Sequence, residues 1–230
     1  MTQIGSSVHS YKGASEIHFI PGDTLNVTIF TERLYLRSVQ PSDLDCYASL
    51  YGDPEAVAKF HDGQPKSREY IQNRIDNIWA KRWRNYDPYN AFTIFDRLTR
   101  EFLGVVILGH SDNPGEAELV GIGKKEFWKR GLATEALSAI ANEYAPATVQ
   151  EGYLLEGRPL TKINATARTD NEASLKLLQR VGMQLQKTEE KFGALRNHYS
   201  LELSQLSSIT AQKTVNEFLK FSSELIQSAA

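Results

Sequence analysis

Residues 126–137 place a glycine and two small residues between a pair of cations and an apolar helical run. Lys129 and Arg130 precede Gly131, and Ala133 and Thr134 follow it where a helix is expected to begin. Backbone N–H groups at a helix N-terminus bind phosphate oxygens when no bulky side chain blocks them, and the helix dipole adds roughly half a positive charge. The spacing indicates an anion cradle, although a tight turn would fit the same residues.

This stretch matches neither of two common nucleotide-binding patterns, because it contains no GxxxxGK[ST] loop and its GxGxxG pattern is incomplete. The five histidines are scattered, without an HExxH motif or a pair four residues apart, so we predict no metal site. Cys46 is the single cysteine, which excludes an intramolecular disulfide and a CxxC site and is typical of a cytoplasmic protein.

The composition is that of an ordinary globular protein. The 230 residues are 41% hydrophobic and 23% charged, with a formal net charge of −2. Nucleic-acid binders are usually strongly basic. No apolar run approaches the roughly 20 residues of a membrane helix, and no signal-peptide pattern is present. We therefore expect a cytoplasmic protein that binds neither nucleic acid nor membrane, and interpret the aromatic and basic residues between Trp79 and Tyr89 mainly as core.

The elements around the cradle predict a mixed sheet. β-rich runs over 91–96, 101–109 and 117–123, separated by turn signals, predict three adjacent antiparallel strands. An amphipathic helix over 132–144, ended by Pro146, then leads to a strand near 162–167 and so forms a β-α-β unit.

We expect three segments along the chain. Residues 1–30 form an N-terminal extension of uncertain order, and residues 31–203 form the domain. Residues 204–230 form a helical tail whose apolar positions share one face. The tail would pack on the domain of a monomer or join two copies in a homodimer.

Two segments resemble motifs of the GNAT superfamily of acyl-CoA N-acyltransferases. IGKKEFWKRGLATEAL resembles the pyrophosphate motif of the ribosomal-protein-alanine and spermidine acetyltransferase branches, and DNEASLKLLQRVGM resembles the N-x-x-S-x-x-L-x-x-x-G-F segment. TERLYLRSVQPSDLD resembles the opening strand and helix of those branches. The resemblance covers about residues 31–203. It implies the GNAT fold, a central mixed and mostly antiparallel twisted sheet flanked by helices, and acetyl-CoA as the acyl donor without a metal.

The resemblance also implies cofactor-binding roles. The cradle amides and the Thr134 hydroxyl would hold the coenzyme A pyrophosphate, and amides where the strand before the cradle splays would polarise the thioester carbonyl. Asn171 and Ser174 match positions that contact the pantetheine arm or thioester, with helix capping and packing as their alternative roles. The predicted set is Ile122, Gly123, Lys124, Lys129, Arg130, Gly131, Leu132, Ala133, Thr134, Asn171 and Ser174.

Glu118 is the predicted general base, because it matches the acidic residue that these branches carry on that strand. Glu116, two residues earlier on the same face, is the other candidate for the base. Alternatively, Glu118 is simply a solvated charge on the strand. The usual tyrosine acid is replaced by Leu178. The proton donor is therefore unassigned, with Ser174 and Tyr199 as candidates.

The implied reaction is direct transfer of an acetyl group to a primary amine, either a protein N-terminal amine or, second, a small amine or polyamine. The loops near 53–66 and 189–197 would receive the acceptor, and their acidic residues favour a cationic amine. Lys129 replaces the usual glycine after Trp128, which adds a phosphate partner but crowds the loop. This change and Leu178 leave a second hypothesis open, a catalytically inactive protein that binds coenzyme A or a protein partner.

Overall fold

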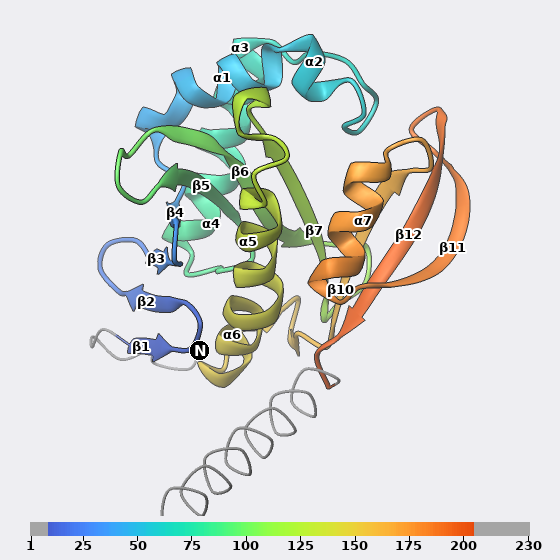
Figure 1. Ribbon diagram of the computed structural model, residues 1–230. Helices are drawn as coiled ribbons and strands as arrows, with labels where there is room; N and C mark the ends of the chain where they lie inside the picture. The colour runs from blue at the N-terminus through green and yellow to red at the C-terminus, as the bar shows by residue number, and fades with distance from the viewer. Residues whose placement is uncertain (1–8, 205–230) are drawn as a thin grey trace, which may run out of the picture.

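A ten-stranded sheet with the order β1-β2-β3-β4-β5-β6-β7-β10-β12-β11 forms the frame of the computed structural model, which describes residues 9–204 (Figure 1). Neighbouring strands are antiparallel except β7 and β10, which run parallel. The strands are β1 (His9–Lys12), β2 (Glu16–Ile20), β3 (Asn26–Phe30), β4 (Leu34–Ser38), β5 (Ala91–Asp96), β6 (Phe102–His110), β7 (Glu116–Gly123), β10 (Lys162–Arg168), β11 (Gln184–Lys191) and β12 (Ala194–Glu202); β8 (Leu154–Leu155) and β9 (Arg158–Pro159) form a separate hairpin.

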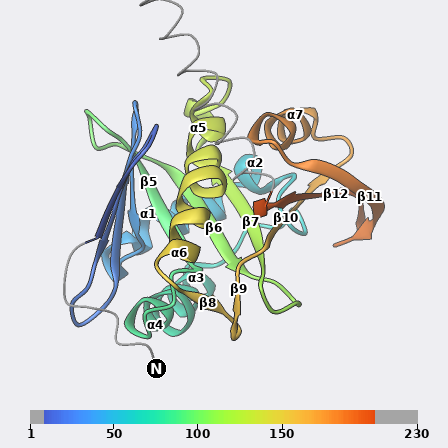
Figure 2. The ribbon, with the colours of Figure 1, turned by 90° about the horizontal axis from the view of Figure 1, so that it is seen from below.

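Helices cover both faces of the sheet (Figures 1 and 2). Phe92 of β5 meets Tyr144 on one face, with ring centroids 4.9 Å apart, and the next residue, Thr93, lies 3.2 Å from the Tyr47 hydroxyl on the other. The first face carries α5 (Leu132–Ser138), η4 (Ala139–Tyr144), α6 (Ala145–Gln150) and α7 (Glu172–Val181), and the second carries α1 (Leu44–Gly52), α2 (Pro54–Val57), α3 (Arg68–Arg74), η2 (Ile75–Trp79) and α4 (Ala80–Arg84); η1 (Pro41–Asp43) and η3 (Lys125–Phe127) are short 3₁₀ turns.

The three antiparallel strands expected from residues 91–123 are confirmed as β5, β6 and β7. The helix expected around the tryptophans is also present, and Trp79 and Trp83 are each 2% exposed. These rings are therefore core residues, because a base-stacking surface would leave them accessible.

Residues 9–30, which we expected to form an extension, continue the sheet as three strands. Phe19 of β2 stacks on Tyr144 at 5.6 Å, and the Ser15 hydroxyl donates to Glu143 at 2.8 Å. Burial of an aromatic face against a helix supplies the apolar contact that a lone hairpin lacks. These strands thus belong to the same core as the rest of the sheet.

The helix expected to end at Pro146 continues through it to Gln150. Residues 139–144 form a π-helical segment, in which the Ala145 N–H bonds to the Ile140 carbonyl five residues back. Pro146 then falls in the first turn of α6, where a missing N–H is tolerated. We call the continuous helix over 132–150 the cradle helix.

The tail expected over 204–230 lies outside the described residues, apart from its first residue. Within residues 9–204, no helix is both long and apolar enough to cross a membrane.

Candidate active site

The parallel pair β7 and β10 separates in the middle of the sheet. Register pairing joins Glu116 to Lys162 and continues only as far as Glu118 and Asn164. Beyond that point β7 follows β6 to Gly123, while β10 follows β12 to Arg168. The two strands therefore form a wedge, and the backbone groups on its inner edges have no strand partner.

The register of β7 decides which amides face this wedge. The Lys124 N–H donates to the Leu103 carbonyl at 2.9 Å, so it points to the β6 side. Because N–H directions alternate along an antiparallel strand, Ile122 points the same way, whereas Gly121 and Gly123 point into the wedge. Of the three amides predicted from sequence to polarise the thioester carbonyl, those of Ile122, Gly123 and Lys124, only that of Gly123 faces the wedge. The Gly121 amide, which was not predicted, faces it as well.

The loop after β7 brings the first turn of the cradle helix to the wedge. Gly131 precedes that turn with φ 77°, and Lys129 adopts φ 60°. Among residues 9–204, no acceptor meets the backbone N–H groups of Leu132, Ala133 and Thr134. These amides remain available to an anion at the positive end of a long helix.

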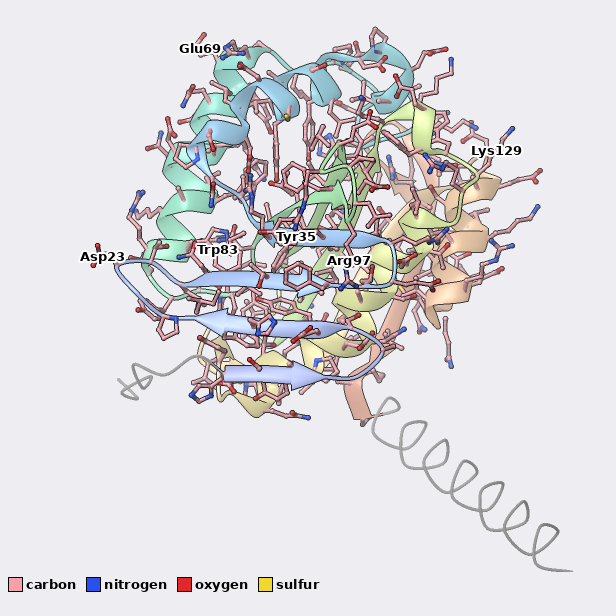
Figure 3. The ribbon with its side chains drawn as sticks, turned by 60° about the vertical axis from the view of Figure 1, so that its left-hand side comes forward. Asp23, Tyr35, Glu69, Trp83, Arg97 and Lys129 are labelled. Atoms are coloured by element: carbon pink, nitrogen blue, oxygen red, sulfur yellow. The ribbon has the colours of Figure 1, made fainter. Side chains whose placement is uncertain are left out.

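The cations of this loop differ in how far they are engaged. Lys125 pairs with Glu55 of α2 at 2.5 Å, and the Arg130 guanidinium lies 5.2 Å from the centroid of the Phe127 ring. Lys129 is exposed and projects from the loop (Figure 3), and it forms no ion pair with any described residue. The backbone of Lys129 is left-handed, a conformation that glycine adopts without steric cost. This explains why the GNAT motif usually has a glycine at this position.

A carboxylate that the sequence reasoning missed holds the cradle in place. Glu135 accepts the Thr31 hydroxyl at 2.5 Å, the Arg33 N–H at 2.8 Å and the Arg33 Nε at 2.6 Å. Burial alone would raise the pKa of Glu135, but these hydrogen bonds outweigh burial and lower it. Arg33 also donates to the Arg130 carbonyl at 3.0 Å. The position of an acidic residue in the first helical turn was the only feature of the sequence that could have pointed to Glu135.

The two carboxylates on β7 have different surroundings. The Glu116 Oε2 accepts from the side-chain amides of Asn164 at 2.8 Å and Asn113 at 3.3 Å. Glu118, half-buried at the vertex of the wedge, accepts no hydrogen bond from the residues that the structure describes. The Glu116 carboxylate is thus committed to structural contacts, whereas the Glu118 carboxylate has no hydrogen-bond donor among the described residues.

Strand register separates Glu118 from Tyr199. Asn164 lies opposite both Glu118 and Ser200, so these three side chains share one face, which we call the Glu118 face. Tyr199, opposite Ala165, points to the other face, where it is 2% exposed. The two predicted catalytic side chains therefore do not meet directly.

The start of α7 lies beside the cradle helix (Figure 2). The Asn171 side chain accepts from the Ser174 N–H at 3.3 Å, so Asn171 caps the helix. Ser174 is partly exposed, and Leu178, in the position expected for a tyrosine, is 5% exposed within the core. Of the two predicted proton donors, Ser174 is thus the one that is partly exposed.

Arg196 and His198 of β12 also lie on the Glu118 face, four and two residues from Ser200, respectively. The His198 Nε2 lies 3.1 Å from the Glu189 Oε1. Burial lowers the pKa of His198 more than the neighbouring carboxylate raises it. A neutral imidazole and a guanidinium therefore stand beside the wedge.

A family model described as an acetyltransferase (GNAT) domain matches residues 33–184. The chain belongs to this GNAT family. It is 27% identical over 177 residues to an uncharacterized N-acetyltransferase p20 of Bacillus licheniformis, covering 74% of this chain and 86% of that protein. Being a GNAT acetyltransferase, it uses acetyl-CoA as its acyl donor, and its resemblance to that family is confirmed.

Solved structures share the fold of this GNAT acetyltransferase. A GNAT-family acetyltransferase from Bacillus anthracis has a TM-score of 0.62 at 16% identity, covering 77% of this chain and 99% of that one. The spermidine N-acetyltransferase from Vibrio cholerae, solved with coenzyme A and spermine, has a TM-score of 0.58 at 16% identity, covering 75% and 97%. The ribosomal alpha-N-protein acetyltransferase RimL, solved with coenzyme A, has a TM-score of 0.60 at 18% identity, covering 75% and 96%. The predicted mixed, mostly antiparallel sheet flanked by helices is therefore confirmed.

Proposed function

We propose that the protein transfers an acetyl group from acetyl-CoA to a primary amine by direct attack within the wedge. The observation that carries this proposal is the position of Glu118. Its unpaired carboxylate lies at the vertex of the wedge, and the free first-turn amides of the cradle helix lie at the open end.

Each group has a role in the proposed reaction. The amides of Leu132, Ala133 and Thr134 hold the pyrophosphate, which places the thioester between β7 and β10. The N–H groups of Gly121 and Gly123 stabilise the negative charge that develops on the carbonyl oxygen. The acceptor approaches from the Glu118 face, so the donor and the acceptor enter from opposite sides of the sheet.

The acceptor amine must lose a proton as the new C–N bond forms. Glu118 removes it through a water molecule, and the C–S bond then breaks. The departing thiolate takes up a proton, for which we favour Ser174 over Tyr199, because Ser174 is partly exposed whereas Tyr199 is buried in the core. Coenzyme A and an N-acetyl amine are the products.

The alternative is a GNAT-fold protein that binds coenzyme A or a protein partner without catalysis. Leu178 supports it, because no tyrosine hydroxyl occupies the position of the usual proton donor. Glu118-dependent turnover separates the two hypotheses.

The test compares Glu118→Gln with Glu116→Gln, which removes the same charge from the same strand. Coenzyme A release would be followed with acetyl-CoA and a broad set of amines, peptides and polyamines, and acetyl-CoA binding would be measured by calorimetry. We expect Glu118→Gln to lower kcat by roughly 100- to 10,000-fold without weakening acetyl-CoA binding. Glu116→Gln should keep most of the activity. A parent protein that binds acetyl-CoA but acetylates no amine would establish the non-catalytic alternative.

A further inference from the structure

Arg196 is a buried cation without a carboxylate partner. It is 3% exposed, and no acidic oxygen lies within 4.0 Å of its guanidinium among residues 9–204. Its Nη2 donates to the His61 carbonyl at 2.6 Å and its Nη1 reaches the Thr166 hydroxyl at 3.4 Å. The Nε is buried and has no hydrogen-bond partner.

Such an arrangement is costly for the protein alone, because a buried charge is ordinarily paired or fully hydrogen-bonded. The adjacent arginine shows the ordinary case. Arg168, the register partner of Arg196 on β10, donates to both carboxylate oxygens of Asp170 at 3.1 and 2.9 Å. The unused capacity of Arg196 therefore calls for an anion that the described residues do not supply.

The guanidinium lies close to the proposed reaction site. Its contact with Thr166 places it two residues along β10 from Asn164, the register partner of Glu118. Two residues of a strand span about 7 Å. A free carboxylate and a free guanidinium thus face the acceptor side at a separation that one small molecule can bridge.

Two loops that we expected to receive the acceptor also enclose Arg196. The rings of His61 and Phe192 lie 3.8 Å apart, and the guanidinium lies 5.4 Å from the Phe192 ring centroid. Both rings are exposed on their outer sides, with Phe192 40% exposed. Because Arg196 is only 3% exposed, a ligand at its guanidinium requires this ring pair to move aside.

The acidic residues of the same loops do not form a free cation site. The five acidic residues of these loops are Asp53, Glu55, Asp62, Glu189 and Glu190. Four of them are already engaged: Asp53 caps α2, Glu55 pairs with Lys125, Asp62 pairs with Lys66 and Glu189 pairs with Lys187. Their negative charge is thus largely neutralised. A polyamine would meet the unpaired guanidinium without a comparable set of free carboxylates.

We propose that Arg196 binds a carboxylate carried by the acceptor itself, so that the acceptor is a small amino acid rather than a polyamine. This inference rests on the proposed function and specifies its substrate class. The amine of such a molecule reaches the thioester near Glu118 while its carboxylate occupies the free edge of the Arg196 guanidinium. The enclosure by His61 and Phe192 favours a small molecule over a polypeptide chain.

The test measures kcat/KM for free amino acids, for the matching amino acid carboxamides, for acidic peptides and for spermidine. We expect the parent to prefer an amino acid over its carboxamide by roughly 10- to 100-fold, the range of a hydrogen bond to a charged group. Arg196→Gln should abolish this preference, because it should lower kcat/KM for the amino acid much more than for the carboxamide. Arg168→Gln, which removes the paired arginine opposite in register, should keep the preference.

Three results would overturn the inference. The parent could acetylate the amino acid and its carboxamide at equal rates, or it could acetylate spermidine or peptides faster than the amino acid. Alternatively, Arg196→Gln could lower kcat/KM equally for the amino acid and for its carboxamide. A merely structural role of Arg196 would produce the last of these. If no amine is acetylated, the proposed function fails, and the inference is then decided by binding. Amino acids should raise the melting temperature of the coenzyme A complex more than carboxamides do, and only when Arg196 is present. The absence of that difference would exclude the carboxylate site as well.

Discussion

Arg37 and Arg196 are two largely buried arginines on the same face of the sheet, and they differ in their partners. Arg37 donates to both oxygens of Asp43, at 2.8 and 2.6 Å, and Asp43 also accepts the Thr93 hydroxyl at 2.7 Å. Burial works to lower the pKa of Arg37, but Asp43 reverses this and raises it. For Arg196 burial prevails, and the pKa is lowered. Arg37 is held by an ion pair within the fold, whereas Arg196 forms no ion pair with a described residue and is the group to which we assign the acceptor carboxylate.

The same distinction runs along β7 and into the cradle. Glu116 is held by two asparagine amides, whereas Glu118 accepts no hydrogen bond from the described residues. The first-turn amides of the cradle helix are likewise without acceptors in residues 9–204. The Glu118 carboxylate and these amides thus line the wedge, where donor and acceptor would meet.

The largest expected effect tests the paired arginine. Asp43→Asn leaves Arg37 buried without a countercharge, so we expect a loss of about 3–5 kcal/mol in the free energy of unfolding. Arg196→Gln removes a cation that forms no ion pair with a described residue, and we expect it to cost far less. Urea unfolding of both variants makes the comparison. Equal losses would show that Arg196 is as structural as Arg37.

The next effect tests the unpaired amides. Gly131→Glu places a negative side chain at the cradle, where like-charge repulsion should weaken acetyl-CoA binding by at least about 100-fold. Gly193→Glu is the matched control, because Gly193 has a similar φ of 71° and nothing within 4 Å of an added Cβ. Calorimetry should find unchanged binding in the control. Equal weakening in both variants would mean that backbone strain, and not the cradle, is responsible.

The smallest effect concerns His110 of β6, the register partner of Ala117. The His110 Nε2 lies 2.7 Å from the Asp87 Oδ2, and this hydrogen bond raises the pKa of His110 above its ordinary value of 6.5. Because the pKa of His110 is higher in the folded state than in the unfolded state, protonation of His110 stabilises the fold. This contribution is fully present below pH 6.5 and is lost as the pH rises through the folded-state pKa.

We therefore expect His110→Gln to be less stable than the parent at pH 5.5 by roughly 0.5–1 kcal/mol, a modest value because the pair is partly exposed. The two proteins should converge at alkaline pH. Unfolding curves across this range provide the measurement. A difference that stays constant with pH would show that the ion pair does not contribute.

The sequence was sufficient for features that depend on local spacing. Alternation and turn residues predicted the β5–β7 strands, and the order of cation, glycine and small residues predicted the cradle before residue 132. Contacts between distant segments were not predictable in this way. The β2 strand buries Phe19 against Tyr144, and the clamp on Glu135 comes from Arg33. In each of these contacts, the sequence around one residue gives no indication of the other residue.

The candidate site was predicted to a similar extent. The choice between Glu116 and Glu118 required the side-chain amides that occupy only one of them. The face of Tyr199 followed from register, which periodicity alone does not fix. Arg196 gave no signal, because a charged residue on an alternating strand normally faces water. Its burial depends on His61, 135 positions earlier in the chain.

The attachment of the first strands to the cradle helix also sets an order of events during synthesis. Phe19 packs on Tyr144 and Tyr153, which are made more than a hundred residues later. At a translation rate of roughly 5–20 residues per second, the apolar face of β1–β3 waits for about 6–25 s before its covering helix exists. The nascent chain thus presents an uncovered hairpin during this interval, and a chaperone that shields extended apolar segments has its longest opportunity there.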